Sequence, residues 1–330
     1  MSIATPAGRA DPARPAGGLS ERRPLGDRGF QWLAAGSGLL VLVILVLIAV
    51  TTTQQAWPWF TKEGLGIFSS TWNPVASKFG ALAFIYGTGI TALIAIILAV
   101  PVSVAIALLL TEVLSRRTAQ PIVYVIDLLA VVPSVVWGLW GILVFAPWLT
   151  GIYGSIGSAV TGVPVLGSLF GPPANGVNSG RSFFTTGIIL AIMITPIVTS
   201  LSREVIATTP TIDKEGAYAL GATRWEMIRG AVWPHSYGGV VGAVLLGLGR
   251  AMGETIAAAL VIGSSAQITS HLFASGDSMP AVIANQFPEA TGVFRAGLIG
   301  LGVLLFVITI IINVVARGIV ARSARRMRGA

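Results

Sequence analysis

Residues 215–226 read Glu-Gly-Ala-Tyr-Ala-Leu-Gly-Ala-Thr-Arg-Trp-Glu, a polar island in a very apolar chain that Trp233-Pro234 closes further on. Of the 330 residues, 54% are hydrophobic and only 10% are charged. The mean hydropathy is +0.82. A soluble protein of this length does not have such a composition. The island therefore indicates a unit that stands outside the bilayer on a membrane protein.

The apolar residues on either side of the island gather in blocks long enough to cross a hydrocarbon core, which takes about 20 helical residues. A spanning segment must satisfy its own backbone polar groups, and the blocks lack the alternation of a β-barrel, so helices are expected. The sequence predicts an all-α integral membrane protein with six transmembrane helices, at residues 30–50, 81–110, 122–145, 183–201, 238–262 and 296–316.

The Lys and Arg residues indicate the orientation of these helices. Sixteen of them lie before the first block, between the second and third, between the fourth and fifth, and after the sixth. The other side holds only Lys62, Lys78, Arg181 and Arg295. By the positive-inside rule both termini are cytoplasmic. Basic helix ends that meet anionic lipid also account for the net charge of +8 without nucleic acid as a partner.

The segments follow from these assignments. The first residues, rich in Ala, Pro, Arg and Gly, lack the apolar density to pack. They are not a signal peptide, because the first apolar run is of full spanning length. We expect a disordered cytoplasmic tail at 1–29, a first transmembrane helix at 30–50, an extracytoplasmic loop at 51–80, a five-helix core at 81–316 with a cytoplasmic loop at 207–236, and a basic cytoplasmic tail at 317–330.

The residue types that carry most enzyme chemistry are scarce. The chain has no cysteine, and its two histidines, His235 and His271, fall on opposite sides of the membrane. None of the three lysines follows Gly or precedes Ser or Thr, so a P-loop for ATP is absent. The sequence therefore predicts no catalytic residue, no metal site, no cofactor and no ATP hydrolysis by this chain in the P-loop manner.

The island carries local signals for two short helices. Thr209-Pro210 predicts an N-cap followed by proline at the first helical position, and Gly221 suits the left-handed position after a helix. Thr223 and Glu226 form a capping-box pattern, and Pro234 is expected to end or turn the second helix. Such a helical hairpin is either an amphipathic unit lying on the membrane or a projection that docks a soluble partner.

The spacing within the island resembles a known family. Glu215 and Gly221 lie six residues apart, Ala217 lies between them, and Pro234 closes the pattern. This is similar to the Glu-Ala-Ala…Gly…Ile-x-Leu-Pro motif of the membrane subunits of bacterial ABC importers with the type I, MetI-like fold. The chain departs from that motif at three positions: Gly216, Ala231 and Trp233.

The resemblance implies that residues 207–236 form a coupling helix, which sits in a groove of a separate ATPase subunit and transmits its closure to the membrane helices. An ATPase in trans also fits the missing P-loop. The residues that the resemblance assigns to this coupling are Glu215, Gly216, Ala217, Gly221, Arg224 and Pro234.

A second polar segment lies within the fifth apolar block. Arg250 and Glu254 are four residues apart, which places them on one helical face. A charge within a span costs about 2.5–3.5 kcal/mol on insertion scales, so it is usually paired or functional. The two residues are either a self-neutralising structural pair or part of a translocation pathway that attracts an anion. Small residues spaced four apart predict close packing of this helix, at Gly238, Gly242, Gly249 and Gly253.

Further stretches resemble the phosphate-specific permeases within the same family, namely residues 23–27, 72–74, 127–141 and 249–255. The stretches 23–27 and 72–74 favour the PstC family over its PstA paralogue. The stretch 127–141 contains Pro133, which is expected to kink the third helix.

This resemblance implies a permease subunit that forms half of a pathway for inorganic phosphate in a bacterial cell membrane. The implied partners are a PstA-like second permease subunit, a PstB-like ATPase dimer, a PstS-like extracytoplasmic phosphate-binding protein and the lipid bilayer. An ABC permease for sulfate or molybdate, and an ion-coupled secondary transporter, remain as alternatives.

Overall fold

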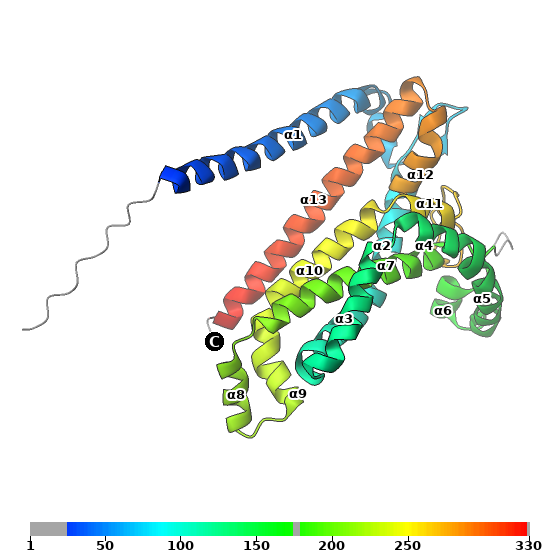
Figure 1. The fold of residues 1–330 in the computed structure, drawn as a ribbon. Helices are drawn as coiled ribbons and strands as arrows, with labels where there is room; N and C mark the ends of the chain where they lie inside the picture. Colours follow the sequence, from blue (N-terminus) through cyan, green and yellow to red (C-terminus); the bar gives the residue numbers. More distant parts are fainter. Residues whose placement is uncertain (1–24, 174–178, 329–330) are drawn as a thin grey trace, which may run out of the picture. The chain divides into compact units, whose positions relative to one another are not determined.

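The computed structural model describes residues 25–173 and 179–328 (Figure 1). Most of the predicted tail at 1–29 therefore lies outside the described residues. The chain divides into two units, Met1–Val50 and Thr51–Ala330, which are considered separately. In the first unit the described residues belong to α1 (Leu25–Glu63), and its Leu, Ile and Val side chains from Leu33 to Val50 are exposed all around the helix.

Helix α1 begins before the predicted start at residue 30 and continues beyond residue 50. The predicted end followed the fall in hydropathy at Thr51–Gln55, but polar side chains do not stop a helix. The helix continues until Gly64, whose φ of +49° is left-handed and breaks the α-helical run. The first half of the predicted loop at 51–80 is therefore helical.

The remainder of that loop forms a small ordered cap. It contains a 3₁₀ turn, η1 (Gly64–Phe68), and an antiparallel pair of short strands, β1 (Trp72–Asn73) and β2 (Lys78–Phe79), with Trp72 opposite Phe79. Trp59 is fully buried in this cap, and its Nε1 donates to the carbonyl of Phe79 over 2.9 Å. At Trp59, then, the indole serves as core and not as a membrane-interface anchor.

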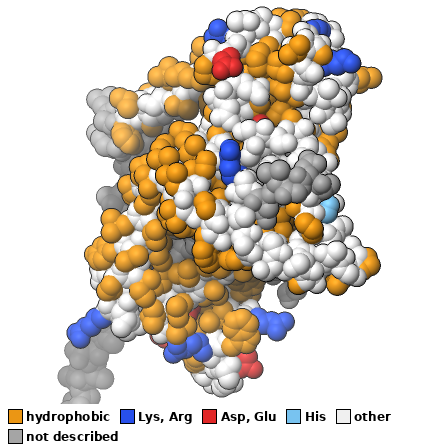
Figure 2. Space-filling view, turned by 90° about the vertical axis from the view of Figure 1, so that its right-hand side faces the viewer, with side chains coloured by type: hydrophobic (Ala, Val, Ile, Leu, Met, Phe, Trp, Pro, Cys, Tyr) orange, Lys and Arg blue, Asp and Glu red, His pale blue; other side chains and the backbone are white. Residues whose placement is uncertain are grey.

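Six helices of the described chain are long and apolar enough to cross a membrane, so the predicted all-α, six-span class is confirmed. On the face drawn in Figure 2, hydrophobic side chains cover most of the middle, and most charged side chains lie near the upper and lower ends. The spans are Gly29–Phe68, Leu82–Val113, Ser134–Val160, Phe183–Ala207, Arg224–Gly253 and Gly292–Gly318.

The third span is shifted from its predicted position at 122–145. Helix α3 (Arg116–Val131) ends before two residues with extended backbone, Val132 (ψ 124°) and Pro133 (ψ 140°). The chain then continues through α4 (Ser134–Trp140), a π-helical turn η3 (Gly141–Phe145) and α5 (Ala146–Val160). Proline disfavours the α conformation at the preceding residue, and at Val132 the chain leaves it, so Pro133 stands at a break in the helix where a kink was expected.

Two further helices occupy segments that were expected to be loops. Residues after Pro147 form the rest of α5, and α6 (Pro164–Phe170) follows it. The fifth span is Arg224–Gly253 and not 238–262 as predicted, so α11 (Ile256–Val261) is a separate helix within the predicted block. In the predicted loop that follows, α12 (Met279–Gln286) and a 3₁₀ turn η5 (Phe287–Glu289) lead to α13 (Gly292–Arg328). Helix α13 includes most of the predicted basic tail at 317–330.

The core of the second unit is built on α2 (Leu82–Leu108) and α7 (Phe183–Ala207), which make the most extensive helix contact. Helix α10 (Trp233–Gly253) packs on both. The glycines that allow its close approach to α7 are Gly239 and Gly247, where an added Cβ would lie 2.4 Å from Val205 and 2.6 Å from Val198. Of the glycines predicted for this role, Gly242, Gly249 and Gly253 have no neighbour within 4 Å of such a Cβ, so they make no close helix contact within this chain.

A buried carboxyl group lies in the connection between the fifth and sixth spans. Asp277 is only 4% exposed and accepts the backbone N–H of Ser278 over 2.8 Å. No described cation forms an ion pair with it. Burial raises the pKa of Asp277 from 3.8 to about 7, although the hydrogen bond from Ser278 opposes this shift.

The raised pKa predicts how stability depends on pH. The folded state holds the Asp277 proton more tightly than the unfolded chain, so this contribution is complete below about pH 4 and is lost as pH rises through 7. The effect of Asp277→Asn on the free energy of unfolding, relative to the wild type, is expected to be more stabilising at pH 8 than at pH 5 by about 2 kcal/mol. Thermal midpoints in detergent at both pH values test this, with the exposed Asp213→Asn as control. An equal effect of Asp277→Asn at the two pH values would contradict it.

Candidate functional site

The polar island forms a helical hairpin that projects from the ends of α7 and α10 (Figure 1). Its first arm is α8 (Thr211–Ala219), which begins one residue later than predicted because Pro210 has extended ψ (134°) and is itself the N-cap. Thr209 does not cap the helix. It is 4% exposed, and its hydroxyl lacks a hydrogen-bond partner among the described residues.

The end of α8 confirms the prediction for Gly221. The residue has φ +84° and follows the C-cap Leu220. The N–H of Gly221 donates to the carbonyl of Tyr218 over 2.9 Å, and the N–H of Ala222 donates to that of Ala217 over 3.1 Å. This pair of bonds is a Schellman motif, which reverses the chain at a left-handed residue.

The predicted capping box starts the second arm, α9 (Arg224–Met227). The Thr223 hydroxyl accepts the N–H of Glu226, and the Glu226 carboxylate accepts the N–H and the hydroxyl of Thr223, both over 2.8 Å. Both ends of the turn are therefore fixed by residues close in sequence.

Pro234 was expected either to end the second arm or to turn it, and the structure contradicts the first alternative, because the helical run continues into α10. A π-helical turn, η4 (Ile228–Val232), joins α9 to α10, and the N–H of Trp233 donates to the carbonyl of Ile228, five residues back. This wider turn precedes Pro234, which is in the first turn of α10 and has no N–H to donate. The hairpin is consequently continuous with the fifth span.

The outer surface of the hairpin is apolar for an element outside the bundle. Tyr218 is 46% exposed, Trp225 is 66% exposed and Leu220 is 90% exposed. Glu215 beside them is exposed and has neither a hydrogen bond nor an ion pair within the described part of the chain. Exposed aromatic and aliphatic side chains with a free carboxylate are typical of a docking surface.

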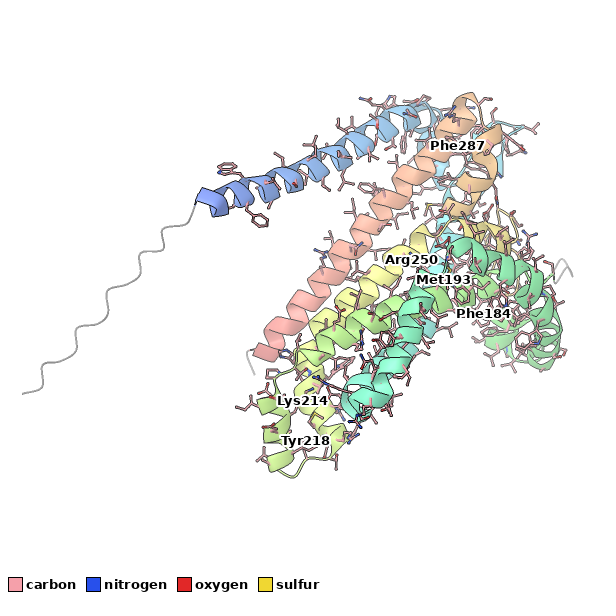
Figure 3. The ribbon with its side chains drawn as sticks, in the orientation of Figure 1. Phe184, Met193, Lys214, Tyr218, Arg250 and Phe287 are labelled. Carbon is pink, nitrogen blue, oxygen red and sulfur yellow. The ribbon has the colours of Figure 1, made fainter. Side chains whose placement is uncertain are left out.

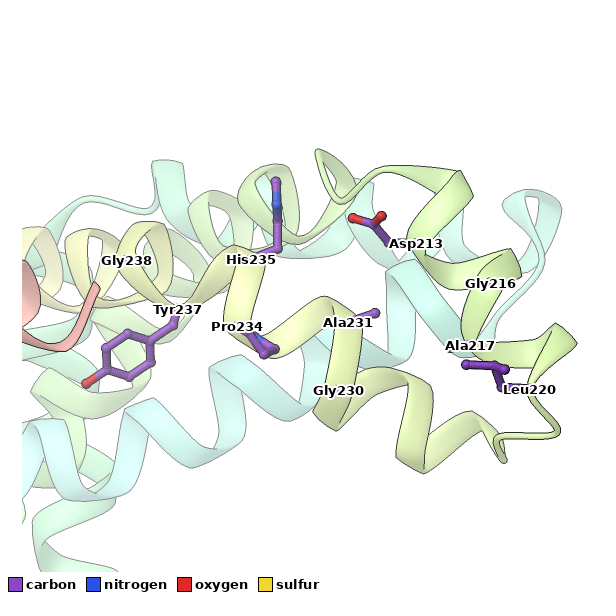
Figure 4. Close-up of a pocket in the computed structure, with 10 residues that line it drawn as sticks. All are labelled: Asp213, Gly216, Ala217, Leu220, Gly230, Ala231, Pro234, His235, Tyr237 and Gly238. Carbon is purple, nitrogen blue, oxygen red and sulfur yellow. The ribbon is translucent and has the colours of Figure 1, made fainter. Parts of the chain in front are cut away.

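Between the two arms lies a cleft of about 770 Å³, drawn in Figure 4. One wall comes from α8 and includes Gly216 and Ala217, and the other includes Pro234 at the start of α10. Space is open around Gly216, so nothing near it requires a glycine. The structure thus brings together all six predicted coupling positions in one hairpin, with Arg224 exposed on its second arm.

Arg250 and Glu254 lie at the other end of α10. Figure 3 shows Arg250 well away from the hairpin residues Lys214 and Tyr218. Helix α10 ends at Gly253, and Glu254 is its C-cap with φ −68° and ψ 123°, so the chain leaves the helix just after Glu254. Arg250 and Glu254 form no ion pair; the Glu254 carboxylate accepts the N–H of Ala257 over 3.5 Å.

Arg250 is an exposed cation without a carboxylate partner among the described residues. Gly249 and Gly253 beside it have open space where a side chain would be, and Leu246 on the preceding turn is 62% exposed. This end of α10 is therefore uncovered within the single chain and available to a ligand or to another subunit.

One contact of the hairpin has no signal in the sequence. Lys214 on α8 forms an ion pair with Glu112, which lies 102 positions earlier in a π-helical turn, η2 (Leu109–Val113), at the end of α2. In the sequence Lys214 contributes only to the topology signal, and no local pattern marks Glu112 as its partner.

Comparison with known proteins identifies the family. Residues 99–329 match the model of the binding-protein-dependent transport system inner membrane component. The chain is 42% identical over 308 residues to the phosphate transport system permease protein PstC of Mesorhizobium japonicum, covering 92% of this chain and 93% of that protein.

Two other relatives have the same printed name. PstC of Xylella fastidiosa is 44% identical over 266 residues, 80% of this chain and 81% of that protein. PstC of Haemophilus influenzae is 40% identical over 290 residues, 87% and 91% respectively. A solved inward-facing structure of the MetNI methionine ABC transporter aligns with 74% of this chain and 94% of that chain, at 14% identity and a TM-score of 0.48, too low to add to the assignment.

The sequence matches cover the core, the hairpin and the Arg250 segment together. The structure supplies the multi-pass helical architecture that an inner membrane component requires. The chain therefore belongs to the family of binding-protein-dependent transport system inner membrane components and, within it, to the PstC permeases.

Proposed function

We propose that this chain is a permease subunit of an ATP-driven importer of inorganic phosphate in a bacterial inner membrane. The observation that carries the proposal is 42% identity, over 92% of the chain, to a protein named as a phosphate transport system permease. The chain forms one half of the pathway, and a PstA-like subunit forms the other half. A PstS-like protein delivers phosphate on the outer side.

The hairpin at 207–236 is the coupling element in this proposal. It docks on a PstB-like ATPase dimer through its exposed face, which includes Tyr218, Leu220 and Trp225. Glu215 has no partner within the described chain and is free to pair with a basic group of the ATPase. The hairpin requires the cytoplasmic side of the membrane, which agrees with the positive-inside orientation and with both termini inside.

Arg250 is the anion contact in the pathway. It is an exposed cation in the last turn of α10, beside the helix break at Glu254. Non-helical backbone at membrane depth is tolerated where it lines a cavity or meets protein, and backbone dipoles at such breaks attract anions. One guanidinium and these dipoles are suited to a partly dehydrated phosphate in passage.

The test is reconstitution of uptake in bacteria that lack their own high-affinity phosphate import. The chain is expressed with its cognate second permease, ATPase and binding protein, and radiolabelled phosphate uptake is measured. We expect uptake to require the ATPase and to persist in excess sulfate or molybdate. Uptake that continues without the ATPase would indicate an ion-coupled transporter, and uptake of labelled sulfate or molybdate would indicate a different substrate.

A further inference from the structure

The hairpin is attached to the helix bundle by a partly buried ion pair. The Lys214 Nζ lies 2.6 Å from the Glu112 Oε1, and the two side chains are 20% and 6% exposed. No other ion pair joins two residues in the described ranges 25–173 and 179–328. A buried charge pair is costly to desolvate and is therefore weak evidence for a purely stabilising role. The Lys214–Glu112 pair joins α8 of the hairpin to η2 at the end of α2, and this position suggests a functional role.

The second arm of the hairpin reaches the same turn. The Arg224 Nη1 donates to the carbonyl of Val113 over 3.5 Å, a weak contact compared with the Lys214–Glu112 pair. Lys214 and Arg224 come from α8 and α9, so one basic residue from each arm meets the end of η2.

An apolar cluster lies beneath these contacts. It joins Ala107 of α2 with Ile206 of α7 and with Met227, Ile228 and Val232 of the second arm. Ala217 of α8 and Leu108 of α2 pack against the same cluster. The hairpin base and the end of α2 thus form one packed unit. Within it the apolar contacts are non-directional, whereas the Lys214–Glu112 pair fixes the position of α8 relative to η2.

The connectivity shows why this matters. Along the chain the hairpin joins only α7 and α10, so a displacement reaches those two helices directly. Helices α2 and α3 have no covalent link to the hairpin. Glu112 lies immediately before the corner where α2 gives way to α3, whose N-cap is Ser115. A contact at Glu112 acts on both helices at their common end.

We propose that the Lys214–Glu112 pair is a positioning contact that transmits displacement of the hairpin to α2 and α3, so that these helices move with α7 and α10 when the ATPase closes. The inference rests on the proposed function. The pair is a linkage within the permease and is separate from the surface that docks the ATPase.

Two sets of variants test the linkage in the complete complex. Glu112→Met combined with Lys214→Met removes the ion pair without leaving an unpaired buried charge. Methionine fills the space with a flexible apolar side chain, so packing is kept while the directional contact is lost. Glu112→Lys combined with Lys214→Glu restores a pair of opposite polarity. Asp213→Asn removes a charge from the adjacent, exposed position and serves as the control. Phosphate uptake and ATP hydrolysis are measured on the same preparations, along with co-purification of the ATPase.

We expect the double-methionine variant to assemble and hydrolyse ATP normally but to import at least fivefold less phosphate per ATP. The exchanged pair should recover at least half of the wild-type ratio, and Asp213→Asn should retain all of it. A double-methionine complex with the wild-type ratio would overturn the inference, since packing alone would then suffice. Failure of the exchanged pair to exceed the double-methionine variant would also overturn it.

The wild-type complex separates this result from the proposed function. If the wild-type chain imports no phosphate with its partners, the proposed function fails and the transport ratio is undefined. If the wild type imports phosphate and the double-methionine variant matches it, only the linkage fails.

Discussion

Arg250→Gln is expected to reduce phosphate uptake at least tenfold while leaving assembly with the ATPase unchanged. Arg250 is exposed in the last turn of α10 and has no carboxylate partner among the described residues, so its removal breaks no internal ion pair. Glutamine keeps part of the length and hydrogen-bonding capacity but not the positive charge. A tenfold loss corresponds to about 1.4 kcal/mol of lost anion stabilisation, modest for a charged contact in a low-dielectric site. The measurement is the initial rate of radiolabelled phosphate uptake.

Two further variants make the Arg250 result specific. Arg250→Lys retains the charge without the planar fork and should give an intermediate rate. Arg117→Gln removes an exposed cation from the start of α3 and should leave uptake unchanged. Wild-type uptake by a correctly assembled Arg250→Gln complex would refute the anion role.

Glu254 separates the two interpretations of the polar segment that the sequence left open. A self-neutralising pair requires contact, and Arg250 and Glu254 form no ion pair in the structure. The Glu254 carboxylate instead accepts the N–H of Ala257, in the first turn of α11, over 3.5 Å. The four-residue spacing could not predict this alternative partner, because Gly253-Glu254-Thr255 gave no clear signal that a new helix starts there.

The features of the hairpin that could be predicted are those held by hydrogen bonds between residues close in sequence. The left-handed Gly221 and the Thr223–Glu226 capping box each depend on bonds spanning a few residues, so their patterns were sufficient. Thr209 failed as a cap because the extended backbone of Pro210 moved the helix start by one residue. Local chemistry thus gave the motif and its turn, with a boundary error of one residue.

Features that depend on distant partners could not be predicted. Glu112 meets Lys214 across 102 positions, and no local pattern distinguishes it from any other carboxylate at a helix end. Likewise, Gly239 and Gly247 are the close-packing glycines because Val205 and Val198 of α7 face them. The four-residue spacing alone had selected Gly238, Gly242, Gly249 and Gly253. Small residues recur at this spacing on more than one face of α10, so spacing could not identify the face that packs against α7.

The break at Pro133 illustrates a different limit. Hydropathy counts the apolar run at 122–145 as one block because proline and its valine neighbours are not polar. The structure divides that run between α3 and α4, and it adds α5 to the span. Composition therefore predicted the number of crossings, but it could not place the ends of the first, third and fifth.

Gly221→Val is expected to abolish both co-purification with the ATPase and phosphate uptake. The residue has φ +84°, a conformation that a β-branched side chain rarely adopts, and holding it there costs on the order of 1–3 kcal/mol. The hairpin relieves that strain most readily by giving up the bonds from Gly221 and Ala222 to the end of α8. Loss of the Schellman motif changes the angle between the two arms, so Tyr218 and Trp225 no longer form one docking face. Pull-down of the ATPase and uptake measure the two losses.

The hairpin offers matched controls for this substitution. Gly216→Ala adds a methyl group to open space inside α8, and should leave assembly intact while favouring the helix by about 1 kcal/mol. Gly221→Asn should retain much of the activity, because asparagine tolerates the left-handed conformation. The order expected for uptake is therefore Gly216→Ala, then Gly221→Asn, then Gly221→Val. If Gly221→Val assembles and transports as well as Gly216→Ala, the turn geometry is not what presents the hairpin to the ATPase, and the coupling role of Gly221 is refuted.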